Sequence, residues 1–137
     1  MRPLLLDTCA LIFLTEKAPI GAAAINAMRA AKEEGAATYI SPISAWEIGM
    51  LTAKGRVQLL IRPERWFGNL FEAPNVRLAE MSPDLLIASS YLPGKPPADP
   101  TDRIIAATAR ELGAMLITRD RALLAYGAQG HMSVVEC

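Results

Sequence analysis

PLLLDTCALIFL, residues 3–14, decides the fold. Its three leucines form a short apolar run typical of a buried strand, and the run ends at Asp7. The next residues, TCALIFL, read as one or two turns of helix. The order strand, acid, helix is typical of an α/β unit, with Asp7 at the carboxyl end of the strand.

The same order recurs along the chain. ATYI (37–40) leads directly into a helix at Ser41, and MLIT (115–118) leads into one at about Asp120. Two more strands are expected at NVRLAE (75–80) and MSVVE (132–136), and further helices at 19–34, from Pro63, from Ser82 and from Asp102. Alternating strands and helices predict a three-layer α/β/α sandwich around a central, mainly parallel sheet of about five strands.

Size and composition predict one globular domain over residues 1–137. Hydrophobic residues make up 52% of the chain and charged residues 20%, which excludes a disordered protein. Fourteen basic residues balance fourteen acidic ones, so net charge gives no sign of a nucleic acid or a membrane as partner. The opening apolar run is too short for a signal peptide, and we expect a cytoplasmic protein with Cys9 and Cys137 reduced.

Three aspartates occupy related positions. Asp7 and Asp120 each follow a strand, and Asp102 opens a helix after the proline-rich loop 91–102. In open parallel sheets, ligands bind in the crevice at the carboxyl ends of the strands. The plainer alternative is that each aspartate only caps a helix, because Asp is among the best N-cap residues.

Glu47 is not explained by capping. It lies a full turn inside the helix that starts at Ser41-Pro42, on the face that a helical wheel assigns to Ile43, Trp46, Met50 and Leu51. A carboxylate desolvated there is costly unless a cation, a metal or hydrogen bonds compensate it. An ion pair with a distant arginine remains the alternative, since Lys54 is two turns away.

Convergence of these four acids would require a cation. Their repulsion at neutral pH would raise their pKa values unless a divalent ion were bound. Oxygen ligands without a histidine or a cysteine pair favour Mg²⁺ or Mn²⁺ over Zn²⁺, and such ions commonly bind substrate phosphates. His131, in a turn beside Gly130, is expected at the surface.

Four ordered segments resemble those of PIN-domain ribonucleases, most closely VapC-type toxins of toxin–antitoxin pairs. The segments are LLLDTCALIFL, SAWEIGML, ADPTDRIIAATAREL and LITRDRALLAYG. The resemblance implies a small α/β sandwich, an acidic Mg²⁺ or Mn²⁺ site and endoribonuclease activity on RNA. It also implies a homodimer and a cognate antitoxin that blocks the site. The catalytic acids carried over from the family pattern are Asp7, Glu47, Asp102 and Asp120.

Within this pattern, we expect Asp7 and Asp102 to be the main metal ligands, with Glu47 and Asp120 acting directly or through water. Neighbouring polar residues that could orient the ligands are Asp99, Thr8, Ser44 and Thr118, and possible contacts to RNA phosphates are Arg103, Arg119 and Arg121. Each of these is equally explained as a cap, a solvated side chain or a local ion pair. Asp102 is expected nearer the metal than Asp99, because it begins the helix.

Other readings stay open. A PIN fold without activity could bind RNA or a protein, although the presence of all four acids disfavours this. A Mg²⁺-dependent phosphoaspartate protein is disfavoured further: a receiver domain needs a late lysine, and none follows Lys95. Large apolar groups in the helices at 19–34 and 63–72, among them Trp66, Phe67 and Phe71, exceed what so small a core needs and could serve a dimer or antitoxin contact.

Overall fold

The computed structural model describes residues 2–137, and the first residue of the predicted domain 1–137 lies outside this range. Its centre is a five-stranded sheet in the order β3-β2-β1-β4-β5, in which every pairing is parallel. The strands are β1 (Leu4–Leu6), β2 (Thr38–Ile40), β3 (Val76–Leu78), β4 (Met115–Thr118) and β5 (Ser133–Glu136). The predicted parallel sheet of about five strands is confirmed.

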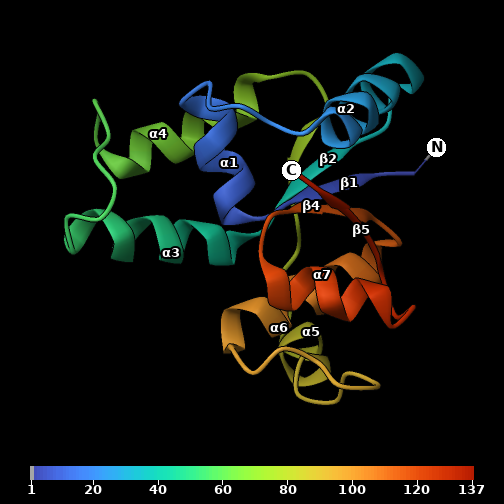
Figure 1. Ribbon diagram of the computed structural model, residues 1–137. Helices are drawn as coiled ribbons and strands as arrows, with labels where there is room; N and C mark the ends of the chain where they lie inside the picture. Colours follow the sequence, from blue (N-terminus) through green and yellow to red (C-terminus); the bar gives the residue numbers. More distant parts are fainter. Residues whose placement is uncertain (1) are drawn as a thin grey trace.

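Helices cover both faces of the sheet, as the sandwich prediction requires. Figure 1 shows α1, α2 and α4 on one side of the sheet and α5, α6 and α7 on the other. The helices are α1 (Thr8–Thr15), α2 (Ala22–Glu34), α3 (Pro42–Ala53), α4 (Pro63–Asn69), α5 (Pro83–Ala88), α6 (Pro100–Leu112) and α7 (Arg121–Ala128), with a 3₁₀ turn at Leu70–Glu72.

The core has two halves, one on each face of the sheet. Side chains of a strand alternate between faces, so Leu4 and Leu6 pack with α1 and α2 while Leu5 packs with α6 and α7. All three leucines are buried, and Leu5 is fully so. The apolar run that opens the chain is therefore the centre of both halves.

Serine and proline start two of the helices as the sequence predicts. The Ser41 hydroxyl accepts from the backbone N–H of Ile43 (3.1 Å), and the Ser82 hydroxyl accepts from that of Leu85 (3.2 Å). In both helices proline follows at the first position, where its missing N–H costs nothing. Gly35 ends α2 with φ +70°, a conformation that glycine adopts without strain.

Two sequence expectations about helix geometry are wrong. The helix expected to begin at Asp102 begins at Pro100, with Asp99 as its cap. On α3 the buried positions are Ser44 and Ile48, whereas Trp46 is 56% exposed. The wheel assigned Trp46 to the apolar face because it weighed hydrophobicity alone, while the structure buries a serine that forms a hydrogen bond there.

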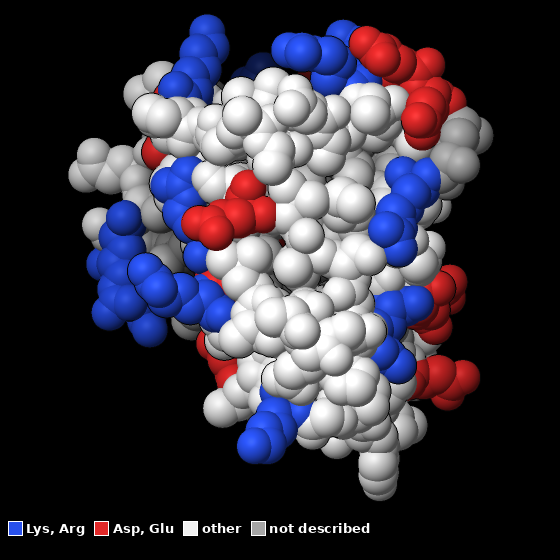
Figure 2. Space-filling model, turned by 45° about the vertical axis from the view of Figure 1, so that its right-hand side comes forward, with Lys and Arg blue, Asp and Glu red and all other residues white. Residues whose placement is uncertain are grey.

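The large apolar side chains expected to be exposed in the helices at 19–34 and 63–72 are mostly packed against the core. Trp66, Phe67 and Phe71 pack, partly buried, against the core half that contains α1 and α2. Of the large apolar side chains that are exposed, Ile25 lies in α2, as expected, and the others lie outside the two helices: Trp46, Leu60, Ile61, Leu78, Leu86, Ile87 and Tyr91. Figure 2 shows one face with a broad uncharged area and charged groups of both signs around it. Among residues 2–137, no helix is long and apolar enough to span a membrane.

Candidate active site

The acids meet at the carboxyl edge of the sheet. Leu6 is level with Ile40 on β2 and with Ile117 on β4, so the residues that follow these strands emerge side by side. The chain builds β2 and β3 on one side of β1 and then crosses to β4 on the other, which makes β1 and β4 the topological switch point. Open α/β sheets bind their ligands at this point, and Asp7 directly follows β1.

Asp7 is buried and held from two sides. Its Oδ1 accepts from the backbone N–H of Ala10 (2.8 Å), so Asp7 caps α1, and its Oδ2 accepts from the Thr118 hydroxyl. The Thr118 oxygen in turn accepts from the backbone N–H of Asp120 (3.0 Å). Thr118 thus connects the acid after β1 with the acid after β4. Burial raises the pKa of Asp7 despite the hydrogen bonds, which oppose the shift.

Glu47 projects from α3 toward the start of α1. The Thr8 hydroxyl donates to Glu47 Oε1 (2.6 Å), and the same Thr8 oxygen lies 3.0 Å from Ser44 Oγ. Burial raises the pKa of Glu47, with smaller contributions in the same direction from Asp99, Asp7 and Asp120. Within residues 2–137 the only ion pair joins Arg62 and Glu64, so the alternative of an arginine partner for Glu47 is not realised.

At the start of α6, Asp99 caps the helix, and Asp102 has a pKa that the other acids help to raise. Asp99 Oδ1 accepts from the backbone N–H (2.8 Å) and the hydroxyl (2.7 Å) of Thr101, which makes Asp99 the cap. Asp102 lies in the first turn, where the helix dipole favours a carboxylate. Its pKa is nevertheless raised to about 7, first by burial and then by the charges of Asp120, Asp99, Glu47 and Asp7.

Asp120 caps α7 through its Oδ2, which accepts from the backbone N–H of Leu123 (2.9 Å). The capping alternative for Asp7, Asp102 and Asp120 is therefore correct for Asp7 and Asp120 and wrong for Asp102, because Asp99 caps α6. Capping does not exclude a second role, because a carboxylate has lone pairs left after one backbone hydrogen bond. Hydrogen bonds connect Asp7 to Asp120 through Thr118, and Glu47 to Thr8, the residue after Asp7. The charges of Asp120, Asp99, Glu47 and Asp7 also contribute to the raised pKa of Asp102.

The chemistry of this donor set fits a hard divalent cation. All donors are carboxylate or hydroxyl oxygens, and none of the carboxylates in the described chain has an arginine or lysine partner at this site. However, within residues 2–137 no three acidic, histidine or cysteine side chains are arranged to enclose an ion. The fit is therefore to an ion such as Mg²⁺ or Mn²⁺, which one or two carboxylates bind while water fills the other positions.

The three arginines beside the acids differ in what they contact. The Arg119 guanidinium donates to the carbonyls of Cys137 (2.6 Å) and Pro19 (3.0 Å) and lies over the Phe13 ring, 4.1 Å from its centre. These contacts join the end of β5 to the region between α1 and α2. Arg103 and Arg121 have no ion-pair partner in the part of the chain that the structure describes, and their contact with RNA stays a prediction.

Cys9 lies close to the acids, although it is not among the site residues expected from the sequence. Cys9 and Cys137 are both free cysteines; Cys9 is exposed and Cys137 is buried. Partial desolvation of the Cys9 thiol, followed by the charges of Asp7, Glu47 and Asp120, raises the pKa of Cys9 to about 11. It therefore stays a thiol at neutral pH. Its position in the sequence, two residues after Asp7 at the start of α1, could have identified Cys9 as a neighbour of the site.

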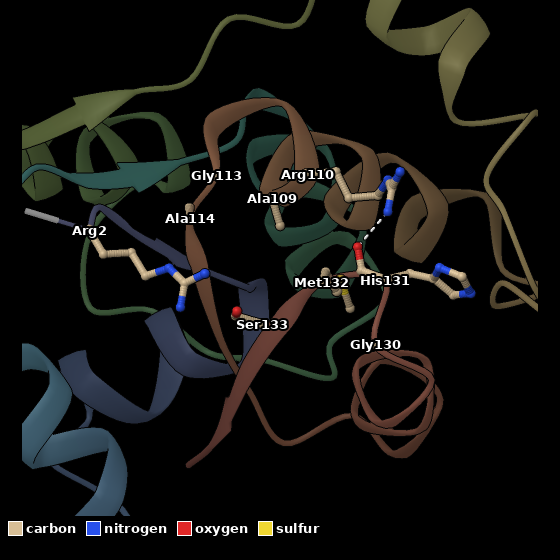
Figure 3. Close-up of a pocket in the computed structure, with 9 residues that line it drawn as sticks. All are labelled: Arg2, Ala109, Arg110, Gly113, Ala114, Gly130, His131, Met132 and Ser133. Carbon is tan, nitrogen blue, oxygen red and sulfur yellow. Dashed lines mark hydrogen bonds between the residues drawn. The ribbon is translucent and has the colours of Figure 1, made fainter.

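A separate cavity of about 500 Å³ lies at the opposite edge of the sheet, before β1, β4 and β5 begin. Its charged or titratable lining residues are Arg2, Arg110 and His131, and it contains no acid. Figure 3 shows the Arg110 guanidinium turned to the backbone carbonyl of His131, to which it donates. This cavity is distinct from the acidic site.

Comparison with known proteins now assigns the family. A family model described as PIN domain matches residues 4–128, which is nearly the whole chain. The chain belongs to the PIN domain family. It is 38% identical over 84 residues to Ribonuclease VapC22 of Mycobacterium tuberculosis, a match that covers 61% of this chain and 63% of that relative. The resemblance read from the four segments is thereby confirmed at the level of the family.

Solved structures support the PIN fold at low sequence identity. VapBC2 from Rickettsia felis, bound to a DNA fragment from its promoter, matches with a TM-score of 0.66 and 16% identity over 98% of both chains. A domain from Methanocaldococcus jannaschii matches with a TM-score of 0.63 and 16% identity, over 100% of this PIN domain and 91% of the other. FitAcB from Neisseria gonorrhoeae matches with a TM-score of 0.56 and 17% identity, over 96% and 95%.

Proposed function

We propose that this PIN domain is an endoribonuclease that depends on Mg²⁺ or Mn²⁺ and acts as the toxin of a toxin–antitoxin pair. The observation that carries the proposal is the convergence of Asp7, Glu47, Asp102 and Asp120 at the switch point without basic partners. A related protein that carries the name ribonuclease VapC22 supports the choice of RNA as substrate.

The bound ion would lower the pKa of a water molecule and offset negative charge on the phosphate that is cleaved. Asp102 is best placed to bind the ion directly, because neither of its oxygens takes part in a hydrogen bond within residues 2–137. Asp7 is held in one orientation by Ala10 and Thr118, and Glu47 by Thr8. These residues bind and orient; cleavage would leave a 5′-phosphate and a 3′-hydroxyl.

Burial, and to a lesser extent the neighbouring acids, raise the pKa values of Asp7, Glu47 and Asp102, so cation binding would be linked to proton release. At neutral pH, Asp102 is partly protonated in the metal-free protein, since its pKa is about 7. A bound cation would favour the ionised form of Asp102 and would offset the repulsion among the carboxylates. Arg103 and Arg121 lie beside the acids in the chain, and we assign them to phosphate groups of the RNA on either side of the cleaved bond.

RNA cleavage with and without Mg²⁺ tests the proposed activity. The wild-type protein and Asp7→Asn are compared, because Asn keeps the shape and the cap hydrogen bond to Ala10 while it removes the charge. Asp84→Asn, on the exposed side of α5, is the matched control. We expect cleavage by the wild type and the control only. Equal cleavage by Asp7→Asn would exclude the proposed site, and no cleavage of any RNA would favour an inactive PIN module that binds RNA or protein.

The proposed partner is a cognate antitoxin, supplied by a neighbouring reading frame. Two of the structural neighbours are VapBC2 bound to a DNA fragment from its promoter and FitAcB, which supports a search for such a partner. Co-expression of the neighbouring small protein should give a stable complex that does not cleave RNA. A complex with full nuclease activity would contradict an antitoxin that blocks the site.

A further inference from the structure

The C-terminal end of α7 is fastened to the loop that leads into α6. The Gln129 side-chain oxygen accepts from the backbone N–H of Lys95 (2.9 Å), and its side-chain nitrogen donates to the Lys95 carbonyl (2.9 Å). The hydroxyl of the buried Tyr126 donates to the carbonyl of Pro93 (2.7 Å). We call these contacts of Tyr126 and Gln129 with the backbone of residues 93–95 the clasp.

Three further contacts tighten the clasp. Gly94 has φ +71°, and a Cβ there would lie 2.3 Å from Nε2 of His131, so the loop approaches the His131 ring as closely as glycine allows. The His131 ring also packs against the Tyr126 ring, with 5.4 Å between their centres. Arg110, in the last turn of α6, donates to the His131 carbonyl (Figure 3). The far ends of α6 and α7 are thereby joined to each other and to the loop.

Both helices carry site acids at their other ends. Asp102 lies in the first turn of α6, and Asp120 caps α7. Between the clasp and α6 the chain reads Pro96-Pro97-Ala98-Asp99-Pro100, with Pro97 buried. Proline fixes φ and stiffens the chain, so proline-rich segments act as semi-rigid spacers. A stiff segment therefore connects Lys95 with Asp99 and the start of α6.

We propose that Gln129 and Tyr126 are positioning residues for the divalent-cation site, which hold Asp99 and Asp102 in place through the proline segment 96–100. The inference rests on the proposed metal-dependent function, although the mechanical link can be measured without a metal. Neither residue touches the acids. Four hydrogen bonds join the C-terminal ends of α6 and α7 and the loop 93–95 into one network. The two partners of each bond are 21 to 34 positions apart in the chain.

Hydrogen exchange and Mn²⁺ titration of the full chain test this link. Gln129→Ala removes both hydrogen bonds to Lys95, and Tyr126→Phe removes the one to Pro93. The chain offers matched controls, Gln58→Ala and Tyr91→Phe, at exposed positions outside the clasp. The amides of Thr101 and Arg103 are the reporters, because both donate to Asp99, to its side chain and its carbonyl respectively.

We expect these two amides to exchange about tenfold faster in Gln129→Ala, a factor that corresponds to about 1.4 kcal/mol of opening free energy. Mn²⁺ affinity should fall severalfold, and neither control should differ from the wild type. Unchanged exchange at Thr101 and Arg103 would overturn the proposal, as would unchanged affinity for Mn²⁺. A wild-type protein that binds no Mn²⁺ would instead contradict the proposed function, and the exchange rates would still decide whether the clasp positions α6.

Discussion

Glu47 shows most clearly what a single side chain contributes to the site. It is half-buried on α3, its pKa is raised by burial, and its compensation is a hydrogen bond from Thr8. One neutral donor compensates a desolvated charge only in part. The metal-free protein therefore keeps Glu47 at a cost in stability, which a bound cation would remove.

Replacement of Glu47 by Gln should stabilise the metal-free protein at pH 7.5. The change removes a charge that burial and the acids Asp99, Asp7 and Asp120 disfavour, so we expect a gain of up to about 1 kcal/mol in the free energy of unfolding. Urea denaturation measures it, with Glu33→Gln on the exposed side of α2 as control. Destabilisation relative to that control would indicate that Glu47 makes a favourable charged contact.

The raised pKa of Asp102 predicts that the metal-free protein is less stable at pH 7.5 than at pH 5. Between its ordinary value and about 7, the folded protein keeps a proton that the unfolded chain has released, so stability falls as pH rises through this window. Asp102→Asn should flatten the dependence, and saturating Mn²⁺ should reverse it. Denaturation curves at the two pH values test this; the same pH dependence in wild type and Asp102→Asn would be inconsistent with a raised pKa.

The acids could be found from the sequence because their positions relative to strands are local. Asp7 and Asp120 follow apolar runs directly, and parallel strands bring such residues to one edge. The link through Thr118 could not be derived in this way, because it joins residues 111 positions apart through side-chain geometry. The same holds for the clasp, where no pattern in residues 91–98 reveals its partners on α7.

From the sequence, Asp102 is expected both to cap and begin the helix and to belong to the acidic site. In the structure, two residues near the start of α6, Asp99 and Asp102, take these roles. Asp99 is the cap and Pro100 is the first helical residue, a position that suits proline. Periodicity defines a helix to within a few residues, and the cap depends on which of two nearby aspartates turns back to the backbone. α3 shows the same limitation: its start was predicted correctly, but its buried face was not.

Substitution of Asp99 should distinguish capping from charge. Asp99→Ala should cost about 1 kcal/mol of folding free energy, because the backbone N–H of Thr101 loses its acceptor. Asp99→Asn should cost little, since Asn caps as well as Asp does. Thermal or urea denaturation measures both. Equal losses in the two variants would indicate that the negative charge of Asp99, and not its cap, stabilises α6.

The molecule as a whole places acids at one edge of the sheet and a basic cavity at the other. The acidic edge coincides with the switch point of a fully parallel sheet, the place where this architecture binds ligands. Net charge is zero, so any attraction of RNA has to come from local groups such as Arg103 and Arg121. Composition alone could not have shown that the acids and the basic cavity lie at opposite edges of the sheet.

The proposed homodimer should form through apolar surface that the fold leaves uncovered. Leu86, Ile87 and Tyr91 are exposed on and just after α5, and Tyr91 is 81% exposed. Sedimentation of the isolated protein at micromolar concentrations should give a dimer, and Ile87→Glu should weaken the dimer. A monomer at high micromolar concentration would contradict the homodimer.

Mn²⁺ titration by calorimetry at pH 7.5 tests the central claim, that Asp7, Glu47, Asp102 and Asp120 share one cation. The wild type should bind saturably, and Asp7→Asn and Asp102→Asn should each weaken binding about tenfold or more. Asp84→Asn should bind as the wild type does, because this carboxylate lies outside the site. Equal affinity in all four proteins, or no binding by the wild type, would contradict a shared cation site.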